Sequence, residues 1–399
     1  MKSFKRGWLS LRHASGRRGI GKRHILYGVL VLILLGISAS YMLRITPYGS
    51  GGSIVYARAR VVENQINASV QYPGSNQTLE AVILDGADKG KRVTVTNSVF
   101  LNDPTTERLA VGKEIVLTKN PLDGNQYLYE DNYRIPGAIV IFLILLALVI
   151  IIGRWRGFTA LVGLTLSITV LVVFVIPRIV AGHSTLAVCI EGALLISTAT
   201  LFIAHGFNRR TTVAFLSACI TLVAVIGISM ASISLTALTG YSDENSFAIQ
   251  AAAHPISLSG LLLGGIIIAS LGVLDDITTG QAAVVDELYK ANTKLTTREL
   301  YRAGLSVGRE HIAALINTLA LAYVGVSLPT IVITVLYNHL PLVLVLNNEA
   351  IMEEIVRTGV ASIGLLLAVP IATLAAAYIL PRWRARNTAE PTVRLKVPV

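Results

Sequence analysis

Residues 135–153 read IPGAIVIFLILLALVIIIG. This stretch holds no charged side chain, and about 20 consecutive apolar residues in a helix are enough to cross the hydrocarbon core of a bilayer. A water-soluble domain seldom contains so long an uncharged run. The stretch therefore predicts a membrane-spanning helix.

Further apolar runs of similar length occur on both sides of this stretch. They cover residues 25–43, 158–176, 185–205, 212–238, 256–274, 312–336 and 360–380. The whole chain of 399 residues is 53% hydrophobic and only 14% charged, a composition typical of proteins that have lipid as their solvent. We therefore expect a polytopic α-helical membrane protein with about eight transmembrane helices, whose main partner is the lipid bilayer.

The distribution of charge predicts how these helices cross the membrane. The net charge is +11, and residues 1–24 hold eight lysines and arginines and no acid. Basic connections fall on the same side as this tail, at residues 154–156, 208–210, 290–309 and 382–384. By the positive-inside rule that side is cytoplasmic. We expect a multi-pass protein of the cytoplasmic (plasma) membrane with both termini inside the cell.

These assignments divide the chain into five parts. They are a basic cytoplasmic tail (1–24), a first transmembrane helix acting as signal-anchor (25–43), an extracytoplasmic β domain (44–131), a seven-helix bundle (135–381) with a cytoplasmic loop (275–311), and a second basic tail (382–399). Residues 38–40 also resemble a signal-peptide cleavage site, so cleavage after the first span stays an alternative. In both cases residues 44–131 lie outside.

Several classes of function lack their sequence signals. The basic charge is concentrated in the tails, whereas nucleic-acid binding needs it spread over a folded face, so we expect no nucleic-acid partner. Cys189 and Cys219 both lie in apolar segments, which excludes a disulfide framework and leaves no metal-type Cys/His spacing. Motifs for zinc proteases, serine hydrolases, phosphate loops and dinucleotide binding are missing. We expect neither an enzyme nor a bound cofactor.

The external segment has a different pattern from the rest of the chain. Short β-branched or alternating runs at 55–62, 79–84, 92–96, 115–118 and 127–129 are separated by turn residues such as Gly86, Gly90 and Gly112. Five short strands predict a small extracytoplasmic β-barrel-like domain, OB-like by analogy of fold. The domain would act as a spacer or as a binding module for an envelope protein.

The sharpest candidate site lies where the sixth span ends, in GVLDDITTGQAAVVDE (272–287). Eleven residues make almost three helical turns, so Asp275 would stand above Asp286 and Asp276 above Glu287 on one helical face. An acidic face at a membrane mouth attracts cations and could form the inner vestibule of a permeation path. The alternatives are a solvated helix end and a helix broken near residues 278–280.

Glu191 is a second candidate, because it lies inside the span 185–205. A carboxylate there is costly unless it is paired, protonated or in contact with water. Its candidate partners on other segments are Arg178, His205, His254 and Asn317. A transport or proton-relay role and a structural hydrogen bond both fit the sequence.

Two local patterns predict details of helix structure. Gly260, Gly264 and Gly265 have the spacing that allows close helix packing. Thr296 and Glu299 form a capping box, which predicts a helix that begins at Thr297.

Three segments together resemble the YibE/F family of bacterial multispanning membrane proteins. They are the β-module segment Asp88–Val95, the acidic segment Gly272–Leu288 and the stretch Ser362–Pro370, within a resemblance over residues 54–382. The family's acidic segment is matched by Asp275, whereas Asp276 stands where a small or apolar residue is usual. The resemblance implies a bacterial cytoplasmic membrane and this architecture. It supplies no substrate, cofactor or catalytic residue.

Two functions follow from these features. Glu191, the acidic segment and the prolines inside two spans, Pro329 and Pro370, favour a permease- or transporter-like protein for a small solute or ion. The alternative is an envelope scaffold or assembly factor, in which the external β domain binds a protein partner.

Overall fold

The computed structural model describes residues 55–68, 74–100, 109–119, 126–242, 244–250, 256–338 and 341–388. The expected first tail, first span and cleavage site lie outside these residues, as do His254 and most of the C-terminal tail. The chain divides into two compact units, residues 43–154 and residues 1–42 with 155–399. Each unit is described by itself.

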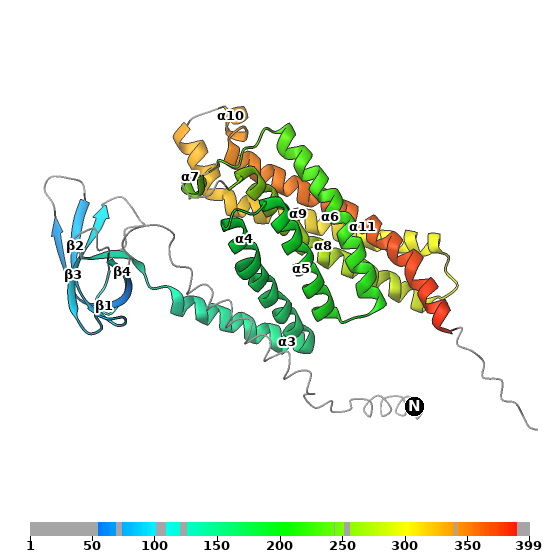
Figure 1. The fold of residues 1–399 in the computed structure, drawn as a ribbon, viewed down its shortest axis with the longest axis horizontal. Helices are drawn as coiled ribbons and strands as arrows, with labels where there is room; N and C mark the ends of the chain where they lie inside the picture. The colour runs from blue at the N-terminus through cyan, green and yellow to red at the C-terminus, as the bar shows by residue number, and fades with distance from the viewer. Residues whose placement is uncertain are drawn as a thin grey trace, which may run out of the picture. The chain divides into compact units, whose positions relative to one another are not determined.

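The first unit contains one antiparallel five-stranded sheet with the strand order β3-β2-β1-β4-β5. Its strands are β1 (Val55–Ala68), β2 (Gly74–Ile83), β3 (Arg92–Phe100), β4 (Glu114–Lys119) and β5 (Tyr127–Asn132) (Figure 1). The two edge strands, β3 and β5, also contact each other, so the sheet curls into a half-barrel. The five expected strands are confirmed, and each expected run overlaps an observed strand.

The alternating pattern of the strands explains why the sheet curls. Apolar side chains on one face form a buried core, whose members are Ala59, Val61, Leu79, Ala81, Val95, Leu109, Ile115 and Leu117. Gln77 is fully buried beside them, and its side chain donates to the carbonyl of Leu109 at 2.8 Å and accepts from the Leu109 amide at 2.9 Å. A buried amide satisfied in this way fixes the segment at Leu109 to the sheet.

Asp88 links the turn before β3 to β4 and β5. Its carboxylate accepts hydrogen bonds from Lys91 Nζ at 2.5 Å, Tyr127 Oη at 2.8 Å and Lys119 Nζ at 3.2 Å. These three donors, Lys91 first, hold the pKa of Asp88 well below its usual range. Burial, together with the bond to Asp88, raises the pKa of Tyr127 to about 12.

Replacing Asp88 by asparagine is expected to loosen the sheet at neutral pH and to have little effect in acid. A carboxyl whose pKa is lowered by folding stabilises the folded state above its unfolded pKa of about 3.9, and this stabilisation is lost as the pH falls through the folded value. Hydrogen–deuterium exchange of the full chain in nanodiscs, normalised for pH, should show several-fold faster exchange in β4 and β5 at pH 7 and a shrinking difference below pH about 4. The exposed Glu63→Gln is the control, and an equal effect of both variants would contradict the assignment.

Seven helices of the described residues are long and apolar enough to cross a membrane. They cover Ile135–Trp155, Gly157–Val180, Thr185–His205, Arg209–Leu235, Leu258–Ala291, Thr297–Ile333 and Glu349–Arg384. Each contains, or nearly contains, one of the expected apolar runs. The chain is therefore a polytopic helical membrane protein, and the expected eighth span, 25–43, is not among the described residues.

The first two of these spans form one nominal helix, α3 (Ile135–Val170), that is interrupted at Arg154. The backbone there has φ 49° and ψ −130°, which breaks the helix within the expected basic connection 154–156. A π-helical segment, η2 (Leu171–Val175), and the short α4 (Ile176–Val180) follow. Pro177 has no N–H for the preceding turn, which accounts for a change of helical hydrogen bonding at this point.

Seven further helices of the second unit are described, and α8 lies among four of the others. They are α5 (Thr185–His205), α6 (Arg209–Leu235), α7 (Glu244–Gln250), α8 (Leu258–Ala291), α9 (Thr297–Asn338), α10 (Leu342–Leu346) and α11 (Glu349–Thr388). In Figure 1, α5, α6, α9 and α11 lie beside α8, and each of them contacts it. The buried core includes Ile266, Ile267, Leu271 and Leu274 of α8.

Close packing between α5 and α8 depends on two of the three expected glycines. A Cβ atom at Gly264 would overlap Sγ of the buried Cys189 on α5, whereas a Cβ at Gly265 would meet open space. A Cβ at Gly260 would lie 3.3 Å from Cβ of Thr185, also on α5. Gly264 and Gly260 therefore let the two helices approach, with the closest contact at Gly264, in agreement with the predicted small-residue packing.

The capping box before α9 is confirmed. The Glu299 carboxylate accepts from the amide and hydroxyl of Thr296, both at 2.8 Å, and the Glu299 amide donates to the Thr296 hydroxyl at 3.3 Å. The helix begins at Thr297, as the sequence predicts.

Candidate functional site

Asp275 lies in the middle of α8, and its side chain is buried. Two hydroxyl groups of α5 bind its carboxylate: Ser197 Oγ donates to Oδ1 at 2.7 Å, and Thr200 Oγ1 lies 2.9 Å from Oδ2. Thr200 precedes the end of α5 at His205 by five residues, or about 8 Å along the helix. The carboxylate is therefore enclosed within the bundle and does not lie in open solvent at a helix end.

The hydroxyl groups around Asp275 are only partly committed to this carboxylate. Thr200 Oγ1 also lies 2.9 Å from the carbonyl of Ile196 and 3.3 Å from that of Ser197, although it has a single proton to donate. One helical turn beyond Asp275, the hydroxyl of Thr279 is buried without a hydrogen-bond partner among the described residues. This part of α5 and α8 thus holds a carboxylate and several hydroxyl oxygens inside the bundle.

A charge in such surroundings has to be neutralised. Within the described parts of the chain, no lysine, arginine or histidine pairs with Asp275. An unpaired carboxylate within a membrane-spanning helix is costly, so it exists as the neutral acid or holds a cation. Carboxylate and hydroxyl oxygens are ligands of small hard cations. The arrangement can therefore bind a proton or a small cation.

The acidic segment is one continuous helix, because α8 runs through residues 278–280 without a break. Because eleven residues make about three turns of α8, Asp275 and Asp286 share its buried face, while Asp276 and Glu287 are exposed. The four acids are therefore two different pairs. Asp276 interacts with His205 at the end of α5.

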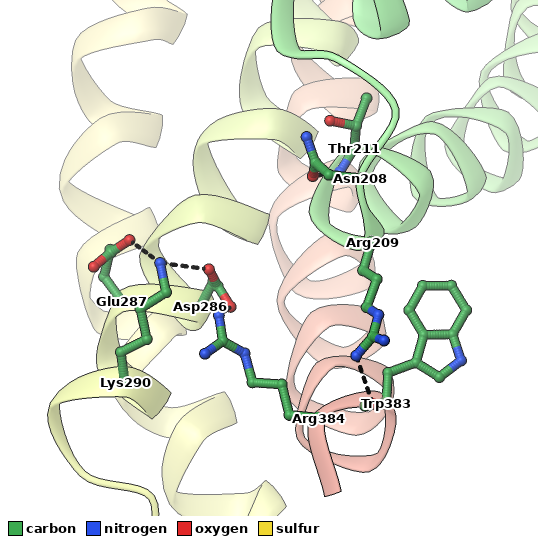
Figure 2. Close-up of polar contacts among 8 residues, drawn as sticks. All are labelled: Asn208, Arg209, Thr211, Asp286, Glu287, Lys290, Trp383 and Arg384. Carbon is green, nitrogen blue, oxygen red and sulfur yellow. Dashed lines mark hydrogen bonds and ion pairs between the residues drawn. The ribbon is translucent and has the colours of Figure 1, made fainter. Parts of the chain in front are cut away.

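Asp286 is neutralised by two cations. Its Oδ2 lies 2.9 Å from Lys290 Nζ, and its Oδ1 accepts from Arg384 Nη2 of α11 at 2.8 Å (Figure 2). Glu287 pairs with the same lysine at 2.6 Å. Both acids thus belong to a network that ties the end of α8 to the end of α11, and they differ from Asp275 in having counter-charges.

A pocket of about 630 Å³ opens beside this network. It is lined by Phe207, Asn208, Arg209, Arg210, Asp286, Leu380 and Arg384. Arg209 Nη1 donates to the carbonyl of Trp383 at 2.5 Å, and Asn208 caps α6 by accepting from the Thr211 amide at 3.0 Å (Figure 2). The basic connections at 208–210 and 382–384 therefore meet at one end of the bundle, called here the basic end.

Glu191 lies apart from Asp275 and is half-exposed on α5. It forms an ion pair with Arg178 of α4, whose guanidinium also lies over the ring of Phe174 at 4.7 Å. Of the three candidate partners among the described residues, Arg178 is the one that pairs with it. The pair anchors α4 to α5. This contact corresponds to the structural role that the sequence leaves open for Glu191 beside a transport role.

Two parts of this arrangement are not apparent from the sequence. Ser197 and Thr200 are spaced so that they share a helix face, but hydroxyl residues are too common in membrane helices to single these out. Arg209, Arg210 and Arg384 are visible as basic connections, yet nothing in their spacing along the chain shows that they line one pocket. The signal that could have located the Asp275 site is an aspartate inside one span together with a pair of hydroxyl residues at i and i+3 in another span.

The seven apolar helices, the half-barrel sheet and the buried intramembrane carboxylate define a polytopic membrane protein with an ionisable site inside its bundle. The sequence profile described as YibE/F-like protein matches residues 141–382, which is more than half of the chain. The chain belongs to the YibE/F family, as the sequence resemblance indicates, and this match covers the helices and leaves the sheet outside. Comparison with curated proteins and with solved structures gave no match.

Proposed function

We propose that the protein is a permease that moves a proton or a small cation across the membrane, and that Asp275 is the group that binds it. The observation that carries the proposal is the buried Asp275 carboxylate, bound by two hydroxyl groups and without a counter-charge among the described residues. A group that must be neutralised in the bilayer is suited to take up and release its neutralising ion.

The site has the features that such an exchange requires. A carboxylate with two hydroxyl ligands binds a cation with few strong bonds, so the ion can also leave. Asp276 lies next to it in sequence and is exposed, which provides a second negative charge on the way out of the bundle. Asp276 is thereby proposed to attract the ion, and Asp275 to bind it.

The same proposal includes a topology. With the basic end on the cytoplasmic side, as the positive-inside rule demands, both termini are cytoplasmic and the sheet is extracytoplasmic. The span expected at 25–43 then brings the count to eight. We also propose that the half-barrel is an OB-like module, because a partly open five-stranded barrel is the form which that fold takes.

Sealed liposomes containing the purified full chain test the proposal. An imposed gradient of sodium, potassium or protons should dissipate faster than in protein-free liposomes, with one of these ions preferred over the other two. Ion fluxes equal to those of protein-free liposomes in all three cases would contradict the permease and favour the envelope scaffold, in which the external sheet binds a protein partner.

A further inference from the structure

The pocket at the basic end has a strong excess of positive charge. Three arginines and a single carboxylate line it, and that carboxylate, Asp286, is already paired with Lys290 and Arg384. Arg209 is held by the carbonyl and ring of Trp383. Arg210 forms no hydrogen bond or ion pair with any described residue, so its five N–H donors are available.

The start of α6 adds to the positive potential of this pocket. Arg209 and Arg210 are the first two residues of the helix, and their backbone N–H groups have no partner within it. Asn208 satisfies the Thr211 amide, and the two residues whose amides it leaves unsatisfied, Arg209 and Arg210, both line the pocket. The helix dipole and the guanidinium groups therefore both make the potential in the pocket positive. Such an arrangement binds phosphate groups.

The surroundings of the pocket favour a ligand at the membrane surface. Phe207, which is 89% exposed, lines the pocket, and Leu380 provides a second apolar wall. The pocket stands at the end of three membrane-spanning helices, where headgroups of lipids lie. Basic pockets between transmembrane helices at this level bind anionic lipid headgroups.

We propose that this pocket binds a phosphate group, carried by an anionic phospholipid, through Arg210, Arg384 and the first amides of α6. A phosphate there would replace Asp286 as the partner of Arg384. Binding of the phosphate would then loosen the link between α8 and α11 that Asp286 provides.

Native mass spectrometry of the purified full chain with phosphatidylglycerol or phosphatidylcholine tests the site. We expect phosphatidylglycerol to be retained preferentially and Arg210→Gln to reduce its retention about fivefold, the contribution of one basic residue at a membrane surface. Asp286→Asn removes the competing carboxylate and should raise retention, an effect that misfolding cannot produce. The control is Arg382→Gln, because Arg382 stacks on Tyr378 at 3.5 Å and does not line the pocket.

An experiment with inorganic phosphate distinguishes a phosphate group carried by a phospholipid from free phosphate. If phosphate at matched ionic strength raises the unfolding temperature of the wild type but not of Arg210→Gln, and phosphatidylglycerol shows no preference, the site binds free phosphate. Equal retention of phosphatidylglycerol by wild type and Arg210→Gln without a phosphate effect, or an equal loss in Arg382→Gln, would overturn the proposal.

Discussion

Replacing Asp275 by asparagine is expected to lower the ion flux through the protein by more than tenfold, to about the rate of protein-free liposomes. Asparagine keeps the shape of the side chain and can still hydrogen-bond to Ser197 and Thr200. It cannot take up a proton or balance a cation, and losing one partner of a buried charged contact costs about 2–5 kcal/mol. Flux in sealed liposomes, with the amount of inserted protein measured in each preparation, checks this result.

Neighbouring substitutions separate a binding role from a structural one. Asp276→Asn, at the exposed acid beside Asp275, should reduce flux only by a few-fold and mainly at low ionic strength, since it acts by attraction at a distance. Ser197→Ala removes one hydroxyl and should weaken the apparent affinity for the ion about tenfold without abolishing transport. Flux that is unchanged in well-folded Asp275→Asn would remove Asp275 from the mechanism.

Replacing Gly264 by leucine is expected to prevent the bundle from assembling. Already the first carbon of the new side chain would overlap Sγ of Cys189, and an overpacked core typically loses about 1–3 kcal/mol even for small additions. Leucine adds three further carbons between α5 and α8, so we expect little monodisperse protein in fluorescence-detected size-exclusion chromatography.

The chain offers a matched control for this effect at the next position. Gly265→Leu introduces the same side chain where a Cβ meets open space, and it should leave the yield and elution volume nearly unchanged. Gly264→Ala should give a yield between those of the two leucine variants. Removing the opposing side chain in the double variant Gly264→Ala/Cys189→Gly should restore the yield and the stability. Normal assembly of Gly264→Leu would show that α5 and α8 do not pack as closely as described.

The sequence predicts the elements of this fold well because their signals are local. An uncharged run such as 135–153 can be satisfied only as a membrane span, and the reciprocal bonds of Thr296 and Glu299 fix the start of a helix within one turn. The alternation along β1 likewise shows which side chains face a core. In each case the interactions that decide the structure lie within a few residues.

The candidate sites depend on contacts between distant residues, and there the sequence is less informative. Asp275 and Asp286 look alike in the sequence, yet one faces hydroxyl groups 75 and 78 residues away while the other faces an arginine 98 residues away. Which of two acids acquires a counter-charge is set by helix packing. For the same reason Glu191, the most conspicuous intramembrane acid, is ion-paired. The carboxylate that has no counter-charge in the described part of the chain, Asp275, belongs to the segment expected at the membrane mouth.

The hydroxyl of Thr200 has a consequence for how easily the site could be emptied and refilled. With one proton and two acceptors at the same 2.9 Å, the carbonyl of Ile196 and the carboxylate of Asp275, it can turn from one to the other without losing a hydrogen bond. Each orientation keeps one hydrogen bond, and a rotation about one side-chain bond is enough to exchange them. A lone pair of the hydroxyl oxygen then faces either the helix or the ion, so the ligand set of Asp275 can change its strength without any movement of the helices.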